Sequence, residues 1–197
     1  MSEAKGFTQV NGVTEYRYFA GGEWRSAEGN RLFDVHQPYD GALYARVAAG
    51  GRAEAKVAVD AAAKAFPAWS QTTPAERARL FFRAVEIVKR RRAGANVLSW
   101  RAVISPVAAG NTVVVKPSEF APISAGLVLA QIVEEAGFPQ GVINVVTHAP
   151  GAAGEIADVR RARQRLGPHR TRQPEGVPGR HLDKFPQRSA GNTRSEH

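Results

Sequence analysis

The sequence contains no cysteine among its 197 residues, and it has no long apolar run. A chain without cysteine has no disulfide, no thiolate metal ligand and no cysteine nucleophile. The longest mostly apolar stretch, residues 123–133, is interrupted by Ser124 and Gln131 and falls short of the roughly 18 residues of a membrane-spanning helix. The first ten residues lack the basic and then apolar layout of a secretory signal. These absences predict a cytoplasmic protein with no membrane partner.

Positive charge is concentrated near one end of the chain. Of the net charge of +9, residues 160–197 carry +7, from nine arginines and one lysine against three acidic residues. This segment is rich in proline and glycine and poor in apolar residues, so we expect a disordered tail. Its arginines favour nonspecific binding of nucleic acid or other anions as an alternative function. Because Phe185 is its one aromatic residue, specific nucleic-acid recognition by base stacking is not expected.

The first half of the chain reads as a hairpin, an extended segment and two helices. Gly21-Gly22 separates the β-prone residues 16–20 and 23–25, which predicts a β-hairpin, and residues 31–35 form a second extended piece. An alanine-rich helix is expected from about Ala53 to Phe66, ended by Pro67. Thr73-Pro74 followed by Glu76 is typical of a capping box that begins the next helix.

Residues 112–146 predict a strand, a crossover helix and a parallel strand. Residues 112–115 are all β-branched and end at Pro117, as expected for a strand covered on both faces. A helix from Pro122 to about Ala136 follows, and residues 142–146 form the next strand. This βαβ pattern predicts an α/β fold with a Rossmann-like sheet.

Charged residues follow the first of these strands directly. Ligands of open α/β sheets bind at the carboxyl ends of strands, where Lys116 and Glu119 lie. An ammonium can donate to ribose hydroxyls or a phosphate, and a carboxylate can accept from two adjacent hydroxyls, so the pair suits the adenosine end of a nicotinamide dinucleotide. Ser118 lies beside them, where it can assist or accommodate a 2′-phosphate. The simpler interpretation is a charged turn that merely ends a strand.

Two segments resemble the coenzyme-binding core of the NAD(P)-dependent aldehyde dehydrogenase superfamily. They read AGNTVVVKPSE at residues 109–119 and EEAGFPQGVINVV at residues 134–146. The earlier segments GGEW, AFPAW and TPAERARL, which begin at Gly21, Ala65 and Thr73, are similar to that family's entry hairpin and first helices. The resemblance is strongest to members that act on aromatic aldehydes such as benzaldehyde or vanillin.

This resemblance implies an NAD or NADP site and assigns residues to it. It makes Lys116 and Glu119 contacts of the adenosine ribose, with Ser118 beside them, and Gly154 a point where the backbone approaches the dinucleotide. A plain loop glycine is the other interpretation of Gly154. The five histidines have no metal-ligand spacing, so no metal site is expected, and turns or the surface are their expected places.

The family's chemistry depends on groups that this chain does not contain. The resemblance implies a cysteine nucleophile, a glutamate base and an oxyanion asparagine, whereas this chain has no cysteine and has Ala93 near the expected asparagine position. Asn96 comes too late to take that role. We therefore predict no catalytic residue in this chain, no aldehyde oxidation, and weak or lost dinucleotide binding.

The pattern divides the chain into three parts: a flexible N-terminus at 1–15, a partial coenzyme-binding domain at 16–159, and the tail at 160–197. Family members carry several dozen more residues near 92–94, which indicates an internal deletion. The arginine-rich tail replaces the strand and loop that the resemblance implies after Val159, as a shifted reading frame of a GC-rich gene would. We expect a truncated relative that has lost the family's oligomerisation elements.

Overall fold

The computed structural model describes residues 6–91 and 97–152 and contains two four-stranded sheets and four longer helices within those ranges. Gly154, the residues around Asn96 and the arginine-rich tail lie outside the described residues. No helix within the described ranges is long and apolar enough to cross a membrane. In chain order the elements are β1 (Phe7–Val10), β2 (Val13–Tyr16), β3 (Tyr18–Ala20), β4 (Glu23–Arg25), η1 (Glu28–Asn30), β5 (Leu32–His36), β6 (Leu43–Ala48), α1 (Arg52–Ser70), α2 (Pro74–Arg91), α3 (Val97–Ala108), β7 (Val113–Val115), η2 (Ile123–Leu127), α4 (Val128–Glu135) and β8 (Ile143–Val145).

The first sheet has the strand order β1-β2-β6-β5, in which β2 and β6 are parallel and the outer pairs are antiparallel. Strand β5 confirms the extended segment predicted near residues 31–35. Its side chains alternate, so that Phe33 and Val35 are buried while Asp34 is exposed. Residues 7–16, which fall mostly within the expected flexible N-terminus, form β1 and β2 instead. The signal for this hairpin is Asn11-Gly12, whose φ angles of 49° and 79° suit a two-residue turn.

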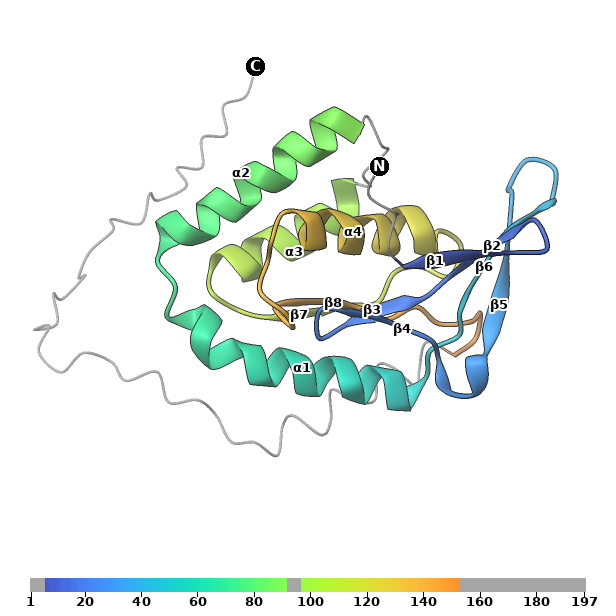
Figure 1. Ribbon diagram of the computed structural model, residues 1–197, viewed down its shortest axis with the longest axis horizontal. Coiled ribbons are helices and arrows are strands. Elements are labelled where there is room, and N and C mark those ends of the chain that lie inside the picture. The colour runs from blue at the N-terminus through green and yellow to red at the C-terminus, as the bar shows by residue number, and fades with distance from the viewer. Residues whose placement is uncertain (1–5, 92–96, 153–197) are drawn as a thin grey trace, which may run out of the picture. The chain divides into compact units, whose positions relative to one another are not determined.

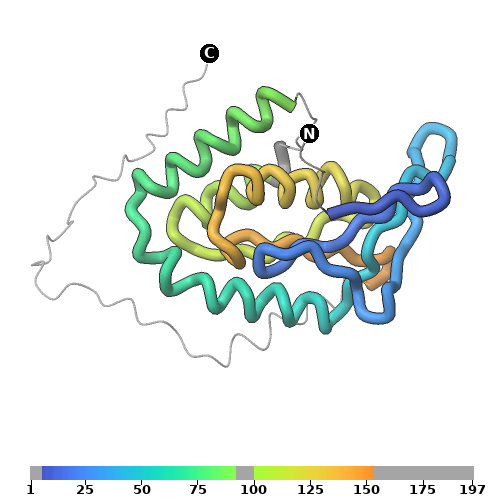
Figure 2. The backbone as a smooth tube through the Cα atoms, in the orientation of Figure 1, coloured from blue at the N-terminus to red at the C-terminus, as the bar shows by residue number. Residues whose placement is uncertain are grey.

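The second sheet has the order β4-β3-β8-β7, and it contains the predicted βαβ unit. Strands β7 and β8 are parallel, with Val113 opposite Ile143 and Val115 opposite Val145, and the chain crosses between them through η2 and α4. Strand β3 pairs antiparallel with β8 through Phe19 and Val145. The amino-terminal hairpin therefore extends the coenzyme-type sheet, as the blue and orange segments lying side by side show (Figure 2).

The predicted hairpin between β3 and β4 forms around Gly21 and Gly22, whose φ angles are 66° and 82°. Positive φ at both central residues is the geometry of a type I′ turn, which glycine adopts without strain. The Gly21 N–H donates to Asn144 Oδ1 at 2.9 Å, so the turn is bonded to the buried strand β8.

Helices cover both faces of the second sheet (Figure 1). Helix α1 packs against β3, β7 and β8 on one face, while α3 and α4 pack on the other face, and α2 contacts α3 and α4 from outside. The prediction that β7 is covered on both faces is thus confirmed. Its residues are nevertheless half-buried, because β7 lies at the edge of the described sheet. The main core joins the sheets to these helices through Phe19, Phe33, Val47, Trp69, Val103, Val107, Leu127, Leu129, Val133, Ile143 and Val145.

The predicted end of α1 is wrong, because the helix continues through Pro67 to Ser70. Pro67 lies in the last turn, where its ring removes one helical hydrogen bond but interrupts no long segment. The next turn is held by tertiary contact: Trp69 is 2% exposed, and its indole N–H donates to Val107 O at 3.1 Å. Burial of an indole of this size outweighs the local preference of proline.

The capping box at the start of α2 is confirmed. The Glu76 carboxylate accepts a hydrogen bond from Thr73 N at 2.7 Å, and the Glu76 N–H donates to Thr73 Oγ1 at 3.2 Å. Hydrogen bonds from the Thr73 backbone and side chain lower the pKa of Glu76. Ala84 and Ile87 of this helix are buried against α4.

Candidate dinucleotide site

The candidate site is built on residues Lys116–Glu119, hereafter the KPSE turn, at the carboxyl end of β7. Strand β7 ends at Val115, and Pro117, which has no N–H to donate to a ladder, is buried behind the turn. Pro117 packs against Gly126 of η2 so closely that a Cβ on that glycine would lie 2.7 Å from Pro117 Cγ. A glycine in the crossover helix therefore fixes the position of the turn that carries Lys116 and Glu119.

Ser118 is exposed in the same turn and orders it locally. Its Oγ accepts a hydrogen bond from Phe120 N at 3.3 Å, and its carbonyl accepts from Ala121 N at 3.2 Å. The hydroxyl proton stays available to a ligand oxygen, because a serine hydroxyl both donates and accepts. Ser118 thus belongs to the turn as predicted, and its role toward a ligand stays a prediction.

The structure adds His148, which the sequence analysis placed in a turn or at the surface. The expectation of a surface position is wrong, because the His148 side chain is 0% exposed. Its Nε2 lies 2.9 Å from Lys116 Nζ and 3.7 Å from Glu119 Oε2, and its Nδ1 lies 2.9 Å from Ala149 O. The rule that pointed to Lys116 also points to His148, since His148 follows closely after β8 and the carboxyl ends of parallel strands share one edge.

Backbone contacts hold the end of β8 in place. The Thr147 hydroxyl donates to Ala48 O at 2.7 Å, and the Thr147 carbonyl accepts from Gly50 N at 3.0 Å. A Cβ at Gly50 would lie 2.6 Å from Thr147 O, so this approach requires a glycine. The loop between β6 and α1 therefore fixes the position of the segment that carries His148.

A buried carboxylate stabilises that same loop. Glu54 is 3% exposed, and its two oxygens accept hydrogen bonds of 2.7 Å from Glu28 N and from Gly51 N. Burial by itself would raise the pKa of Glu54, but these backbone donors together lower it. The carboxylate is thus held in its charged form and ties the start of α1 to η1.

The site offers charged donors and acceptors at one edge of the sheet. A lysine ammonium has three N–H donors, so after the contact with His148 up to two remain for a ligand. The Glu119 side chain is 24% exposed, which leaves its carboxylate accessible to hydroxyl donors. These groups fit the hydroxyls of a ribose. Among the described residues there is no cluster of three histidine or acidic side chains that could hold a metal ion.

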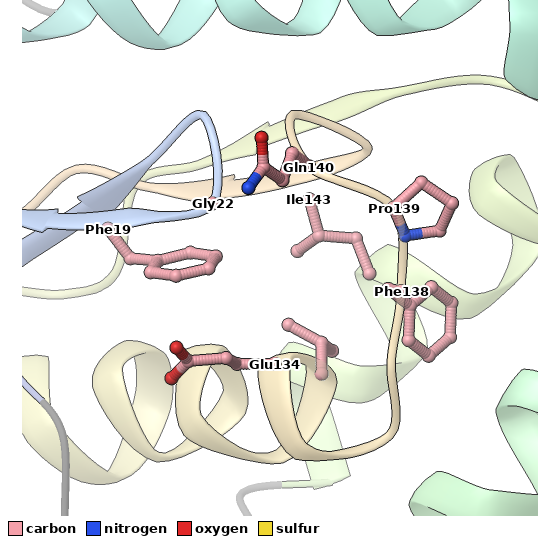
Figure 3. A pocket seen from close by; sticks show the side chains of 8 residues that line it. Phe19, Gly22, Glu134, Phe138, Pro139, Gln140 and Ile143 are labelled. Atoms are coloured by element: carbon pink, nitrogen blue, oxygen red, sulfur yellow. The ribbon is translucent and has the colours of Figure 1, made fainter.

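A pocket of about 260 Å³ lies elsewhere, at the amino end of β8 (Figure 3). Phe19 and Ile143 project from the sheet toward α4, and the rest of the lining is Gly22, Val133, Glu134, Phe138, Pro139 and Gln140. The Glu134 carboxylate already accepts a hydrogen bond from the Trp24 indole at 2.9 Å. This pocket is at the opposite end of the strand from Lys116 and His148, so it is not part of the candidate site.

Comparison with known proteins identifies the class of this fold. The chain matches the aldehyde dehydrogenase family over residues 24–99 and 94–161, and it belongs to that family. The Rossmann-like, mixed α/β core predicted from the sequence is the amino-terminal, coenzyme-binding part of the family's structures.

The matched regions cover most of this chain but less than half of the length of each relative. Vanillin dehydrogenase of Pseudomonas fluorescens is 28% identical over 206 residues, which include 70% of this chain and 42% of the relative. A salicylaldehyde dehydrogenase from Pseudomonas putida G7 superimposes with a TM-score of 0.68 at 23% identity, covering 73% of this chain and 44% of that structure. An NAD-dependent benzaldehyde dehydrogenase from Corynebacterium glutamicum gives 0.64 at 25% identity, covering 72% and 46%.

Proposed function

We propose that this chain binds the adenosine end of NAD or NADP through Lys116 and Glu119, with Ser118 beside them, and that it does not oxidise aldehydes by itself. The observation that carries the proposal is the placement of both charged side chains at the carboxyl edge of the β7–β8 pair, around one buried imidazole. The NAD dependence stated for the benzaldehyde dehydrogenase relative supports this choice of ligand.

The residues present suit binding and not turnover. Lys116 donates to a ribose oxygen or a phosphate, and Glu119 accepts from the two ribose hydroxyls. A carboxylate at this place favours NAD, because it would repel a 2′-phosphate. A bound nicotinamide ring supplies a hydride acceptor. Because the chain has no cysteine, it has no thiolate to attack an aldehyde.

Isothermal titration of the purified 197-residue chain with NAD⁺ and with NADP⁺ tests the binding. We expect weak saturable binding, tighter for NAD⁺, that Lys116→Ala abolishes, whereas Glu119→Gln reduces the preference for NAD⁺. Lys64→Ala and Glu86→Gln are matched controls, since both side chains are exposed on helices. Equal binding by the Lys116 variant and the wild type would refute the assignment.

An absorbance assay for reduced nicotinamide tests the second half of the proposal. Benzaldehyde, vanillin and salicylaldehyde are the substrates to use, because relatives of these names match the chain. We expect no NAD⁺-dependent or NADP⁺-dependent absorbance increase at 340 nm above the level without protein. Measurable turnover by the purified chain would overturn the claim of inactivity.

We also propose an internal deletion between α2 and α3 and a shifted reading frame after about residue 159. The family match falls into two segments that overlap at residues 94–99, and the 206-residue alignment uses only 70% of the chain. Both observations support an internal deletion, in which several dozen residues of the relatives have no counterpart in this chain. Translating the gene in its other frames tests the second point. An absence of Phe-Thr-Gly-Ser-like and Glu-Leu-Gly-Gly-like sequences downstream would refute it.

The excess of arginine in residues 160–197 favours one alternative, nonspecific binding of nucleic acid. In a mobility-shift assay, replacement of Arg160, Arg161, Arg163 and Arg165 by glutamine would then weaken binding of every duplex sequence equally. Binding would also fall steeply with salt. A sequence preference that survives high salt would instead show specific recognition.

A further inference from the structure

His148 is an unusual neighbour for two charged groups because its ring is fully buried. The segment that carries it after β8 is fixed by the Thr147 contacts to Ala48 and Gly50, and its side chain is 0% exposed. Lys116 and Glu119 are the charged groups of the described residues that the structure brings to its Nε2, and both come from the KPSE turn. The ring therefore has little room to reorient when its charge changes.

The two ring contacts define which nitrogen of the imidazole carries the proton. A carbonyl oxygen can only accept, so the 2.9 Å contact between His148 Nδ1 and Ala149 O requires a proton on Nδ1. An ammonium can only donate, so the 2.9 Å contact between Lys116 Nζ and His148 Nε2 requires a lone pair on Nε2. The neutral tautomer with its proton on Nδ1 satisfies both contacts.

We propose that His148 is a positioning residue whose protonation decides which of the two charged residues is available to the dinucleotide. The neutral ring accepts from Lys116, holds the ammonium at the sheet edge and leaves Glu119 to the ribose hydroxyls. The imidazolium carries a proton on Nε2, repels Lys116 and donates to Glu119, whose Oε2 is 3.7 Å away. This inference rests on the proposed function, and it adds a pH-dependent control to the same site.

The predicted direction of the pH dependence of dinucleotide binding follows from both contacts. When the ring takes up a proton on Nε2, the site loses the positioned ammonium and the carboxylate becomes engaged with the ring. Dinucleotide binding should therefore weaken in acid, by about tenfold if one charge-assisted hydrogen bond to the ligand is lost.

Titration of the full chain with NAD⁺ at about pH 7.5 and about pH 5.5 tests the proposal. We expect wild-type binding to weaken in acid, while His148→Gln, whose amide oxygen can still accept from Lys116 but takes up no proton, shows little pH dependence. His36→Gln, at an exposed histidine of β5, should behave like the wild type. Equal acid sensitivity in His148→Gln and the wild type would overturn the proposal.

Nitrogen NMR of ¹⁵N-histidine-labelled protein without ligand separates this proposal from the proposed function. The signals missing from His148→Gln assign His148, and we expect protonated Nδ1 and unprotonated Nε2 near neutral pH. The Nε2 shift should move in Lys116→Met. The opposite tautomer would overturn the inference even if NAD⁺ binds. If NAD⁺ does not bind the wild type at either pH, the proposed function fails and the pH control fails with it, whatever the tautomer.

Discussion

The indole N–H of Trp24 donates to Glu134 Oε2 at 2.9 Å, joining β4 to α4 across 110 residues of sequence. The same indole side chain packs against Phe19, with ring centroids 4.9 Å apart. The amino-terminal hairpin is thus fastened both to the sheet, through β3 and β8, and to the crossover helix that follows the KPSE turn. The hairpin is a structural part of the coenzyme-type core.

Replacing Trp24 by phenylalanine tests this link. The ring contact with Phe19 is largely kept, but the hydrogen bond to the carboxylate is lost, which should lower the free energy of unfolding by about 1.5–3 kcal/mol. Urea denaturation followed by circular dichroism measures the change. Trp100→Phe is a control at the α2–α3 contact, and a loss there as large as in Trp24→Phe would argue against a specific role of the carboxylate.

Asn144 should be a second sensitive position, because its amide is fully buried and fully bonded. Its Oδ1 accepts from Gly21 N at 2.9 Å, and its Nδ2 donates to Val113 O at 3.1 Å and to Gly141 O at 2.8 Å. Asn144→Ala leaves three backbone groups without this partner and should cost about 1–3 kcal/mol of stability or more. The exposed Asn111→Ala serves as the control in a thermal melt, and equal melting temperatures of the two variants would contradict the prediction.

Acid should destabilise the fold through Glu54. Its pKa is lowered from the ordinary 4.5 in the folded state, so the unfolded chain binds more protons as the pH falls below that value. The stabilisation is therefore complete above about pH 4.5 and is lost as the pH falls through the lowered pKa. We expect Glu54→Gln to be less stable at neutral pH and to show a shallower decline in acid, measured by urea unfolding.

The matched control for Glu54→Gln is Glu86→Gln. Glu86 is exposed and pairs with Lys89 at 3.0 Å on the surface of α2, a type of ion pair that contributes little to stability. Its acid profile should follow the wild type. Parallel profiles for the Glu54 variant and the wild type would show that the buried carboxylate does not dominate the acid response.

Gly126→Ala should lower both the stability of the fold and the affinity for the ligand. The added methyl would lie 2.7 Å from Pro117 Cγ and 3.0 Å from Val145 Cγ1, so the turn or the helix must move. Overpacking of this kind costs about 1–3 kcal/mol. Displacement of the KPSE turn should also weaken NAD⁺ binding in titration calorimetry. Ser124→Ala, at an exposed position of the same η2 turn, should leave both quantities near wild type.

Local sequence signals predicted those elements that local chemistry controls. Gly21-Gly22 predicted the β3–β4 hairpin, Thr73 and Glu76 predicted the helix start, and the β-branched run before Pro117 predicted β7. Each signal acts within a few residues, through positive φ, a reciprocal hydrogen bond or a missing N–H. The placement of Lys116 and Glu119 at the sheet edge follows from the same local pattern.

Features that involve distant partners were predicted wrongly or were missed. Pro67 stays inside α1 because Trp69 is buried against Val107, 38 residues away. Asn11-Gly12 forms a hairpin turn whose second strand, β2, pairs with the distant strand β6. His148 is buried because β7 and β8 are parallel neighbours, which brings its ring to Lys116.

The sequence by itself determined the family, the βαβ core and the absence of a cysteine nucleophile, because motif spacing and composition are properties of the chain alone. Only the tertiary structure decided that one buried imidazole lies beside both the ammonium of Lys116 and the carboxylate of Glu119. Contacts of this kind depend on strand order and helix packing, and these arise from burial of surfaces far apart in sequence.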